Sequence, residues 1–510
     1  MRIRVAIAVL FAFCVLARGA QATEAAEGQT SVTHHTLDLA DGPLNYTATA
    51  AFLPVLDDRP PGHADPDKAG DGGDKAKDAV AETERAKVFT VSYVVDGGDA
   101  AQRPVTFVFN GGPGAASAYL HLGAVGPRVL AFGEDGSLPA PPPHLQDNPD
   151  TWLRFTDLVF IDPVATGFSR LTRRDDDAGR SFFSVEGDAT YLAGIVRLWL
   201  ARNDRWGSPK YLAGESYGGF RSIFMARELQ RHQGITVNGL VMVSPLLDQV
   251  TIDDDAADLL SWAVHLPAMA AIARQNGRGD PDMDPHLVET FALSDYLTGL
   301  ATRTLADPTS LTHLYATVAR LTGLPLDQVE RYRGEIPIRF FAHELLHDKG
   351  AVISLYDGTF SAPDGDPAAD GLAQDPLLDG SIGAYATGFN LYAQSELGFH
   401  TGALYRLLDT DINRRWDWGR KVGYAGAIEA LQTLFNLAPH LRILVAHGRF
   451  DLVTPWMGSQ WLLGRLVVPE AARHQIELKV YDGGHMLYMH APSRHLLSAD
   501  VRDLIEDPSR

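Results

Sequence analysis

A serine stands among glycines in the stretch YLAGESYGGF, residues 211–220. An apolar run precedes it and the helix-like stretch RSIFMARELQR follows it, so Ser216 is expected at a sharp strand-to-helix turn. Gly214-Glu215-Ser216-Tyr217-Gly218 fits the pattern G-x-S-x-G, in which small neighbours allow a strained turn to project the serine hydroxyl. The pattern therefore indicates a nucleophile for acyl transfer.

A serine hydroxyl is a weak nucleophile unless a base accepts its proton and an acid orients that base. On this kind of scaffold the chain order is serine, then an acidic residue, then histidine. Asp451 follows the apolar run RILVAHG, and His485 follows LKVYDGG. Catalytic side chains of open α/β sheets lie at such strand ends, so we predict that Ser216, Asp451 and His485 form a triad.

The reaction also needs two N–H groups that stabilise a developing oxyanion. The stretch FVFNGGPGAAS, residues 107–117, is a strand-like run followed by a glycine-rich loop. We expect the N–H groups of Gly112 and Tyr217 to form the oxyanion hole. A phosphate-binding loop is the alternative, but the stretch lacks the GK[ST] ending and Pro113 removes one donor.

A second motif, HELLH at residues 343–347, fits the zinc-protease pattern H-E-x-x-H. Ile353 stands where a third histidine would follow, and no glutamate occurs before Glu396. The motif also lies away from the strand ends that carry the other chemistry. We therefore expect an ordinary amphipathic helix, no metal and no cofactor, and keep a zinc protease that uses His343, Glu344 and His347 as an alternative.

The elements that position these residues alternate between strand and helix, which predicts an α/β fold with a mostly parallel central sheet flanked by helices. Short apolar runs predict strands over 157–162, 210–214, 237–245, 441–448 and 476–483, and helices are expected over 185–203, 220–232 and 491–506. Two further strands, 88–95 and 104–109, are separated by DGGDAAQR and are expected to form a hairpin.

Shifts in composition suggest five segments. These are a signal peptide (1–22), an N-terminal segment (23–87) whose residues 57–87 form a flexible linker, a first core part (88–245), a mainly helical insertion or cap (246–437) and a second core part (438–510).

The N-terminus has the features of a secretory signal. MRIR is basic, VAIAVLFAFCVLA is apolar, and AQA at 20–22 is an A-x-A cleavage site. The single cysteine, Cys14, lies inside this segment, so the mature chain is expected to contain no thiol and no disulfide. Such a chain suits a bacterial periplasm or the external medium. No later segment is expected to span a membrane, and the net charge of −20 disfavours nucleic acid as a partner.

Four stretches resemble motifs of the serine carboxypeptidase family, peptidase S10, within the α/β-hydrolases. They are FNGGPGAAS (109–117), DPVATGFS (162–169), GESYGG (214–219), and the pair GRFDLVTP and DGGHM (448–455 and 482–486). The resemblance implies an α/β-hydrolase fold and, with the absent disulfides, a bacterial disulfide-free branch. It also implies that peptides with a free C-terminus are the substrates, and that Asn110, Gly111 and a protonated Glu215 bind the terminal carboxylate.

The chain departs from the family pattern in several places. Phe109 replaces a tryptophan, Ala115 replaces a cysteine, Ala124 stands where a second glutamate usually supports the carboxylate site, and Thr454-Pro455 replaces Cys-Asn. The triad is intact, while carboxylate recognition is reduced. We therefore predict an exported serine-type carboxypeptidase that works through an acyl-enzyme. An esterase, amidase or acyltransferase on the same triad and a non-catalytic binding protein are the alternatives, and oligomeric state and side-chain preference stay open.

Overall fold

A computed structural model describes residues 30–56, 84–97, 99–172, 181–252, 258–419 and 425–507. The expected signal peptide and residues 57–83 of the expected linker lie outside these ranges. Within them, no helix is both long enough and apolar enough to cross a bilayer.

The strands run in chain order as β1 (Ser31–Leu39), β2 (Gly42–Leu56), β3 (Glu84–Val95), β4 (Val105–Phe109), β5 (Arg128–Leu130), β6 (Leu145–Asp147), β7 (Asp157–Ile161), β8 (Arg170–Leu171), β9 (Lys210–Glu215), β10 (Gly239–Val243), β11 (Ala351–Ile353), β12 (Ser361–Pro363), β13 (Arg442–Gly448) and β14 (Ile476–Tyr481).

The helices are α1 (Ala118–Leu120), α3 (Val185–Arg202), α4 (Tyr217–His232), α5 (Leu259–Gln275), α6 (Pro285–Phe291), α7 (Leu297–Ala301), α8 (Pro308–Thr322), α9 (Leu326–Arg331), α10 (Ile338–Glu344), α11 (Leu378–Ser395), α12 (Thr410–Arg414), α13 (Ile428–Leu437), α14 (Trp456–Gly464), α15 (Glu470–Arg473) and α16 (Ala491–Glu506).

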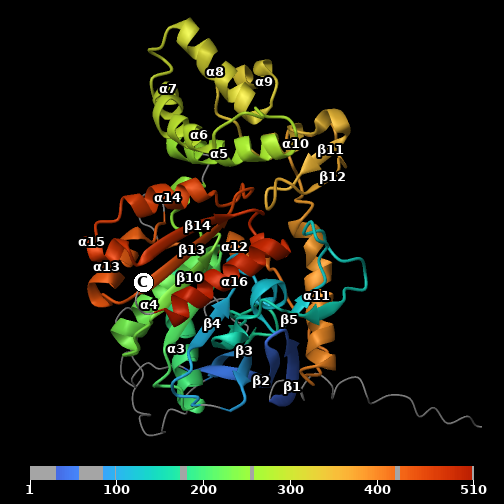
Figure 1. The fold of residues 1–510 in the computed structure, drawn as a ribbon, viewed down its shortest axis with the longest axis vertical. Coiled ribbons are helices and arrows are strands. Elements are labelled where there is room, and N and C mark those ends of the chain that lie inside the picture. The colour runs from blue at the N-terminus through green and yellow to red at the C-terminus, as the bar shows by residue number, and fades with distance from the viewer. Residues whose placement is uncertain are drawn as a thin grey trace, which may run out of the picture.

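One large sheet organises the molecule, with strand order β1-β2-β3-β7-β4-β9-β10-β13-β14 and β8 paired to β3 (Figure 1). From β7 to β14 all neighbours are parallel, whereas β1, β2, β3 and β7 pair antiparallel. Parallel strands present their carboxyl ends at one edge, so the residues that follow β4, β9, β13 and β14 are brought to the same side.

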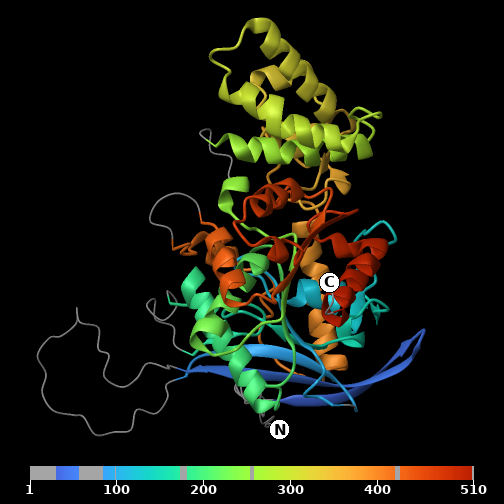
Figure 2. The same ribbon diagram turned by 60° about the vertical axis from the view of Figure 1, so that its left-hand side comes forward.

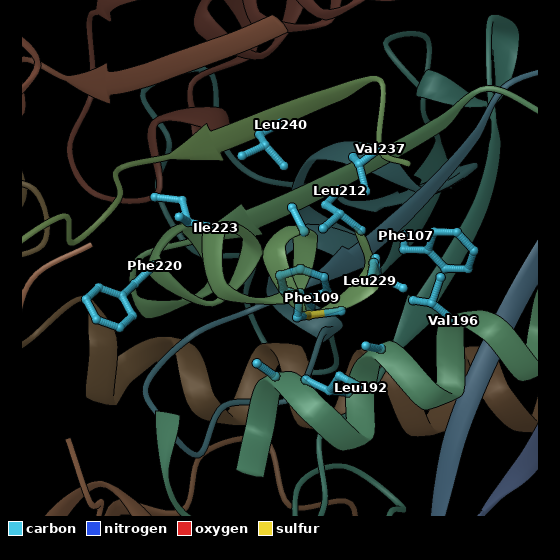
Figure 3. Close-up of a cluster of buried hydrophobic side chains, with 14 of the residues drawn as sticks. Phe107, Phe109, Leu192, Val196, Leu212, Phe220, Ile223, Leu229, Val237 and Leu240 are labelled. Carbon is cyan, nitrogen blue, oxygen red and sulfur yellow. The ribbon is translucent and has the colours of Figure 1, made fainter. Parts of the chain in front are cut away.

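Alternate residues of the central strands enter two different cores, because successive side chains of a strand point to opposite faces. Phe107 and Phe109 of β4 pack with α3 and α4 in one core, while Val108 packs with α11 and α16 in the other. Figure 3 shows Leu192 of α3 and Ile223 of α4 in the first core, beside Leu212 and Leu240 of the strands.

Residues 262–372, within the segment between β10 and β13, form a third cluster, whereas α11 and α13 of the same segment pack into the other two cores. Helices α5–α9 gather at one end of the molecule, beyond the sheet, and β1 and β2 lie at the opposite end (Figures 1 and 2). Their apolar core includes Trp262, Met269, Phe341 and Val352, and it also takes in Leu452 from the loop after β13. The cap is therefore joined to the core by side-chain packing at that loop.

The strands and helices expected at 157–162, 210–214, 237–245, 441–448, 476–483, 185–203, 220–232 and 491–506 are confirmed, with shifts at some ends. The hairpin expected between 88–95 and 104–109 is wrong. β3 pairs with β2 and β7, and β4 pairs with β7 and β9, so β7 lies between them. The residues between β3 and β4 are typical of a hairpin turn, but β7, which is distant in sequence, pairs with both strands and separates them.

Two further differences concern the N-terminal region. The paired strands β1 and β2 carry alternating burial but were not anticipated. In addition, β3 begins at Glu84, inside the range assigned to the linker. The five segment boundaries remain a prediction.

A buried ion pair links α4, the helix that follows Ser216, to α3. Arg221 of α4 donates from Nε to Asp188 Oδ2 of α3 over 2.6 Å, and both side chains are 1% exposed. The same guanidinium donates to the Asn110 carbonyl at the start of the glycine loop. One arginine thus connects α3, α4 and that loop.

We predict that Asp188→Ala lowers the free energy of unfolding by about 3–5 kcal/mol, because it leaves the Arg221 charge buried and unpaired. Urea denaturation followed by circular dichroism measures the loss. The matched control is Glu186→Ala, an exposed acid in the first turn of the same helix, which is expected to cost under about 1 kcal/mol. Equal losses in the two variants would contradict this role for the pair.

Candidate active site

Ser216 occupies a strained turn between β9 and α4. Its backbone has φ 59° and ψ −125°, a conformation that L-residues rarely adopt. The Ser216 N–H donates to the Val243 carbonyl over 2.9 Å, and the Ser216 carbonyl accepts from the Gly219 N–H over 2.9 Å. These bonds hold the turn in place, and its side chain is partly exposed.

The glycines around Ser216 are required by close backbone approach. A Cβ on Gly214 would lie 2.1 Å from the Gly218 carbonyl oxygen, and one on Gly218 would lie 2.9 Å from the Phe109 oxygen. A Cβ on Gly219 would lie 2.5 Å from Pro245. Only hydrogen fits at these positions, which explains the glycine-rich sequence on both sides of the serine.

The glycine loop after β4 lies directly beside this turn. A Cβ on Gly111 would lie 2.6 Å from the Tyr217 nitrogen, and Gly112 has φ +97°. Within the described residues, neither the Gly112 N–H nor the Tyr217 N–H donates to a protein acceptor. Two unused donors at the N-terminus of α4 can therefore receive an anionic oxygen.

Asp451 and His485 are brought together from the ends of β13 and β14. Asp451 Oδ2 lies 2.8 Å from His485 Nδ1, and the two side chains are 0% and 3% exposed. Asp451 Oδ1 accepts from the Val453 N–H (2.7 Å) and the Thr454 N–H (3.1 Å). The carboxylate is thus fixed by its own loop and orients the imidazole.

Thr454 adds a contact that sequence reasoning missed. Its hydroxyl lies 2.9 Å from Asp451 Oδ2 and 2.9 Å from the Ser244 carbonyl, and its one proton serves one of these acceptors at a time. At this position the sequence departs from the carboxypeptidase motif that it resembles. The structure gives the threonine a supporting role for the Asp451 carboxylate.

Backbone links place the histidine loop beside the serine turn. The residue after Val243, Ser244, donates its hydroxyl to the His485 carbonyl over 2.8 Å. Val243 itself holds the Ser216 N–H. Within the described residues, neither Ser216 Oγ nor His485 Nε2 has a hydrogen-bond partner, so the two groups that would exchange a proton are both free of other bonds.

The imidazole of His485 is a stronger base than usual. Burial on its own lowers the pKa of His485, but the charge of Asp451 and the hydrogen bond to it outweigh burial and raise that pKa. The ion pair therefore stabilises the imidazolium that forms when a serine proton is taken.

Glu215 lies next to Ser216 and is 4% exposed. Asn110 Nδ2 donates to Glu215 Oε2 over 2.7 Å, and the Tyr488 hydroxyl donates to the same oxygen over 2.8 Å. Burial raises the pKa of Glu215 to about 7, although the charge of His485 and the two hydrogen bonds act in the opposite direction. The carboxyl can therefore hold a proton close to neutral pH.

The Tyr488 ring also packs beside the turn that contains Ala124. Ala124 is 1% exposed and carries no polar side chain. A Cβ on its neighbour Gly123 would lie 2.4 Å from the Tyr488 ring, so the ring packs against this turn. Tyrosine thus supplies a polar contact to Glu215 from beside the position where a second glutamate was expected.

The insertion contributes main-chain support through the hairpin of β11 and β12. The Tyr356 carbonyl accepts from the His485 N–H over 2.5 Å, and the Leu355 carbonyl accepts from the Leu452 N–H over 3.0 Å. The Tyr356 ring stacks edge-on to the His485 ring with centroids 5.1 Å apart. Nothing in the sequence pattern of this segment signalled these contacts.

The amphipathic helix expected over the H-E-x-x-H motif is wrong, because the motif does not form one regular helix. α10 ends at Glu344, and His347 begins a separate short turn. Glu344 Oε1 accepts from Gln328 Nε2 over 2.6 Å, so the glutamate is engaged on the side of α9. The arrangement lacks the free glutamate base that a zinc protease requires.

We predict that Thr454→Val slows covalent labelling of Ser216 by a fluorophosphonate at least about tenfold, because it removes a hydrogen bond to the Asp451 charge that contributes about 1.5–3 kcal/mol. Second-order labelling rates followed by intact mass measure the change, and Ser216→Ala should not be labelled. The exposed Thr312→Val in α8 is the control and should label like the unmodified chain. Unchanged labelling of Thr454→Val would contradict the role of this hydroxyl.

Comparisons with known proteins come from sequence and from structure. Residues 80–267 match the family model described as serine carboxypeptidase. The chain is 30% identical over 151 residues to pheromone-processing carboxypeptidase KEX1 of Yarrowia lipolytica, covering 29% of this chain and 22% of the relative. It is 33% identical over 120 residues to kex1 of Sclerotinia sclerotiorum, covering 23% and 17%. The matched stretches thus span about a fifth of these relatives.

The crystal structure of the Saccharomyces cerevisiae prohormone-processing carboxypeptidase Kex1 superposes with a TM-score of 0.53 at 15% identity, covering 90% of this chain and 91% of that chain. At this identity the likeness concerns the fold, and it confirms the expected α/β-hydrolase architecture with a mostly parallel sheet. The sequence similarity to serine carboxypeptidases, peptidase S10, thus concerns residues 80–267, and the structural likeness concerns the fold.

Proposed function

We propose that the protein is a serine-type carboxypeptidase that removes residues from the free C-terminus of peptides through an acyl-enzyme. The observation that carries the proposal is one cluster: the Ser216 turn, two unused N–H groups beside it, and the Asp451–His485 pair held to the same turn through Ser244. The similarity of residues 80–267 to the serine carboxypeptidases supports the same reaction.

In this mechanism, His485 Nε2 accepts the proton of Ser216 as the hydroxyl attacks the scissile carbonyl. Their contact is assigned to the substrate complex, since hydrogen bonds between catalytic groups often tighten only there. Asp451 stabilises the resulting imidazolium, and the N–H groups of Gly112 and Tyr217 stabilise the oxyanion. His485 then protonates the leaving amino acid, and water repeats the sequence on the acyl-enzyme.

Recognition of the terminal carboxylate is assigned to Asn110, Gly111 and Glu215. A carboxylate beside an ionised Glu215 would be repelled, so binding requires that Glu215 carry a proton. Its raised pKa, about 7, makes this protonated form available in mild acid and at neutrality. Tyr488 holds the Glu215 oxygen and supplies support that Ala124 cannot give.

We also propose that the protein is exported to a bacterial periplasm or to the medium, as a member of a disulfide-free branch. The basic and apolar segment at residues 1–22 and the A-x-A site support export. The only cysteine is Cys14, within that segment, which supports a mature protein without disulfides.

We predict that a peptide with a free C-terminus is trimmed at least about 100-fold faster than its C-terminally amidated form, because the amide lacks the charge that the carboxylate site binds. Mass spectrometry of paired peptides over time measures the ratio. Equal rates on both peptides would contradict the carboxypeptidase assignment. Rapid turnover of acyl esters with negligible trimming of either peptide would instead support an esterase on the same triad.

We predict that kcat/KM for a free-acid peptide falls as the pH rises through about 7, because Glu215 loses its proton there. Toward acid kcat/KM also falls, starting above pH 6.5, because the pKa of His485 is raised from its ordinary value of 6.5 and the protonated imidazole cannot act as a base. In Glu215→Gln the amide does not ionise, so the decline near pH 7 should disappear, while the acidic decline remains and moves to lower pH because the Glu215 charge no longer raises the pKa of His485. A profile of the variant that still falls through pH 7 would contradict this role for Glu215.

A further inference from the structure

Three potential metal ligands meet where α10 approaches the β11–β12 hairpin. They are His343 at the end of α10, His347 in the turn that follows, and Asp364 directly after β12, and their ligand atoms lie within 4.8 Å of one another. Two imidazoles and one carboxylate are a donor set that suits Zn²⁺ and other first-row transition ions. None of these residues has a role in the reaction proposed above.

The carboxylate of Asp364 has an unused buried oxygen. Its Oδ1 accepts from the Asp366 N–H over 2.9 Å, whereas its buried Oδ2 has no hydrogen-bond partner. The Asp364 side chain is 4% exposed and that of His343 is 5% exposed. Although His343 Nε2 lies 3.2 Å from Oδ2, the two atoms lack hydrogen-bond geometry; Nε2 instead donates to the Asp366 carbonyl over 3.3 Å, a bond that a metal ion at Nε2 would replace. A buried acceptor left without a donor is costly, and a cation would satisfy it.

One of the three separations between ligand atoms matches that of a tetrahedral site, and all three lie within 4.8 Å. Zinc–ligand bonds of about 2.0–2.1 Å separate neighbouring ligand atoms by about 3.3 Å. Asp364 Oδ2 lies 3.2 Å from His343 Nε2 and 4.0 Å from His347 Nδ1. The His347 side chain is 42% exposed, so a small rotation of this one side chain would close the longer gap.

An ion can reach this point from solvent. His343 and Asp364 line a cavity of about 380 Å³, which extends along the segment after β12. The exposed edge of His347 leaves room for a water ligand in the fourth position. The site therefore combines two buried ligands with one accessible ligand, which are the elements of a preformed cation site.

We propose that His343, His347 and Asp364 bind one Zn²⁺ ion that ties α10 to the β11–β12 hairpin. The role is structural, because Glu344 is hydrogen-bonded to Gln328 and is not free to act as a base. From the sequence we expected either no metal or a catalytic zinc ion, and a structural zinc ion is a third possibility. The third ligand, Asp364, lies 17 positions after His347 and is not part of the H-E-x-x-H motif.

The test uses the full untagged chain, dialysed first against a chelator and then against buffered Zn²⁺. We expect about one zinc per chain by elemental analysis, and a melting temperature several degrees higher with Zn²⁺ than without it. His347→Gln should lose the bound zinc and the thermal shift while keeping the melting temperature of the metal-free protein, since its side chain is partly exposed. The control is His286→Gln, an 89% exposed histidine in α6, which should bind zinc as before.

Asp364→Asn is the second variant, because it retains the size of the side chain but replaces the charged ligand. It should also lose the stoichiometric zinc. The proposal is overturned if the unmodified chain takes up no zinc, or if His347→Gln and Asp364→Asn bind as much zinc as the unmodified chain. Zinc uptake without any thermal shift would overturn the structural role.

Discussion

The structure depends above all on the close approach of two backbone segments at the end of β9. The turn at Ser216 holds an unfavourable conformation, φ 59°, and the loop after β4 passes so near that a Cβ on Gly111 would lie 2.6 Å from the Tyr217 nitrogen. Strain of this kind persists only where the surroundings over-determine it. Here the adjacent parallel strands, the buried Arg221 side chain and the packing of α3 and α4 supply that constraint. The serine is thereby held at the end of β9, beside the unused N–H groups of Gly112 and Tyr217.

Two titratable side chains, Glu215 and His485, are buried in the same site. Burial favours the neutral form of both, yet Asp451 adds its charge to His485, while Glu215 has no cation bonded to it. The charge of each group also acts on the other: the charge of His485 lowers the pKa of Glu215, and the charge of Glu215 raises the pKa of His485. The proposed reaction uses the form in which the proton resides on Glu215 and not on His485. A bound carboxylate favours that form, since it repels the ionised glutamate.

Much of the sheet and the candidate triad could be predicted from the sequence, because strand ends carry recognisable signals. Ser216, Asp451 and His485 each follow a short apolar run, and glycine marks the turns around them. The supporting contacts could not be predicted in the same way. Tyr488 and Thr454 are ordinary residue types whose roles depend on distant partners, and the hairpin expected after β3 was wrong because β7 intervenes. A sequence pattern identifies a strand, but tertiary packing decides which strand lies beside it in the sheet.

The main-chain support that the β11–β12 hairpin gives to the histidine loop has a consequence for how this protein could diversify. The hydrogen bonds from the His485 and Leu452 N–H groups end on backbone carbonyls of residues 355 and 356, and Gly358 returns one to the Phe450 carbonyl. Bonds between backbone atoms do not depend on which side chains are present. Substitutions in the hairpin therefore leave these bonds in place as long as its backbone path is kept. The position of the histidine loop is in this way protected from sequence change in the segment that supports it.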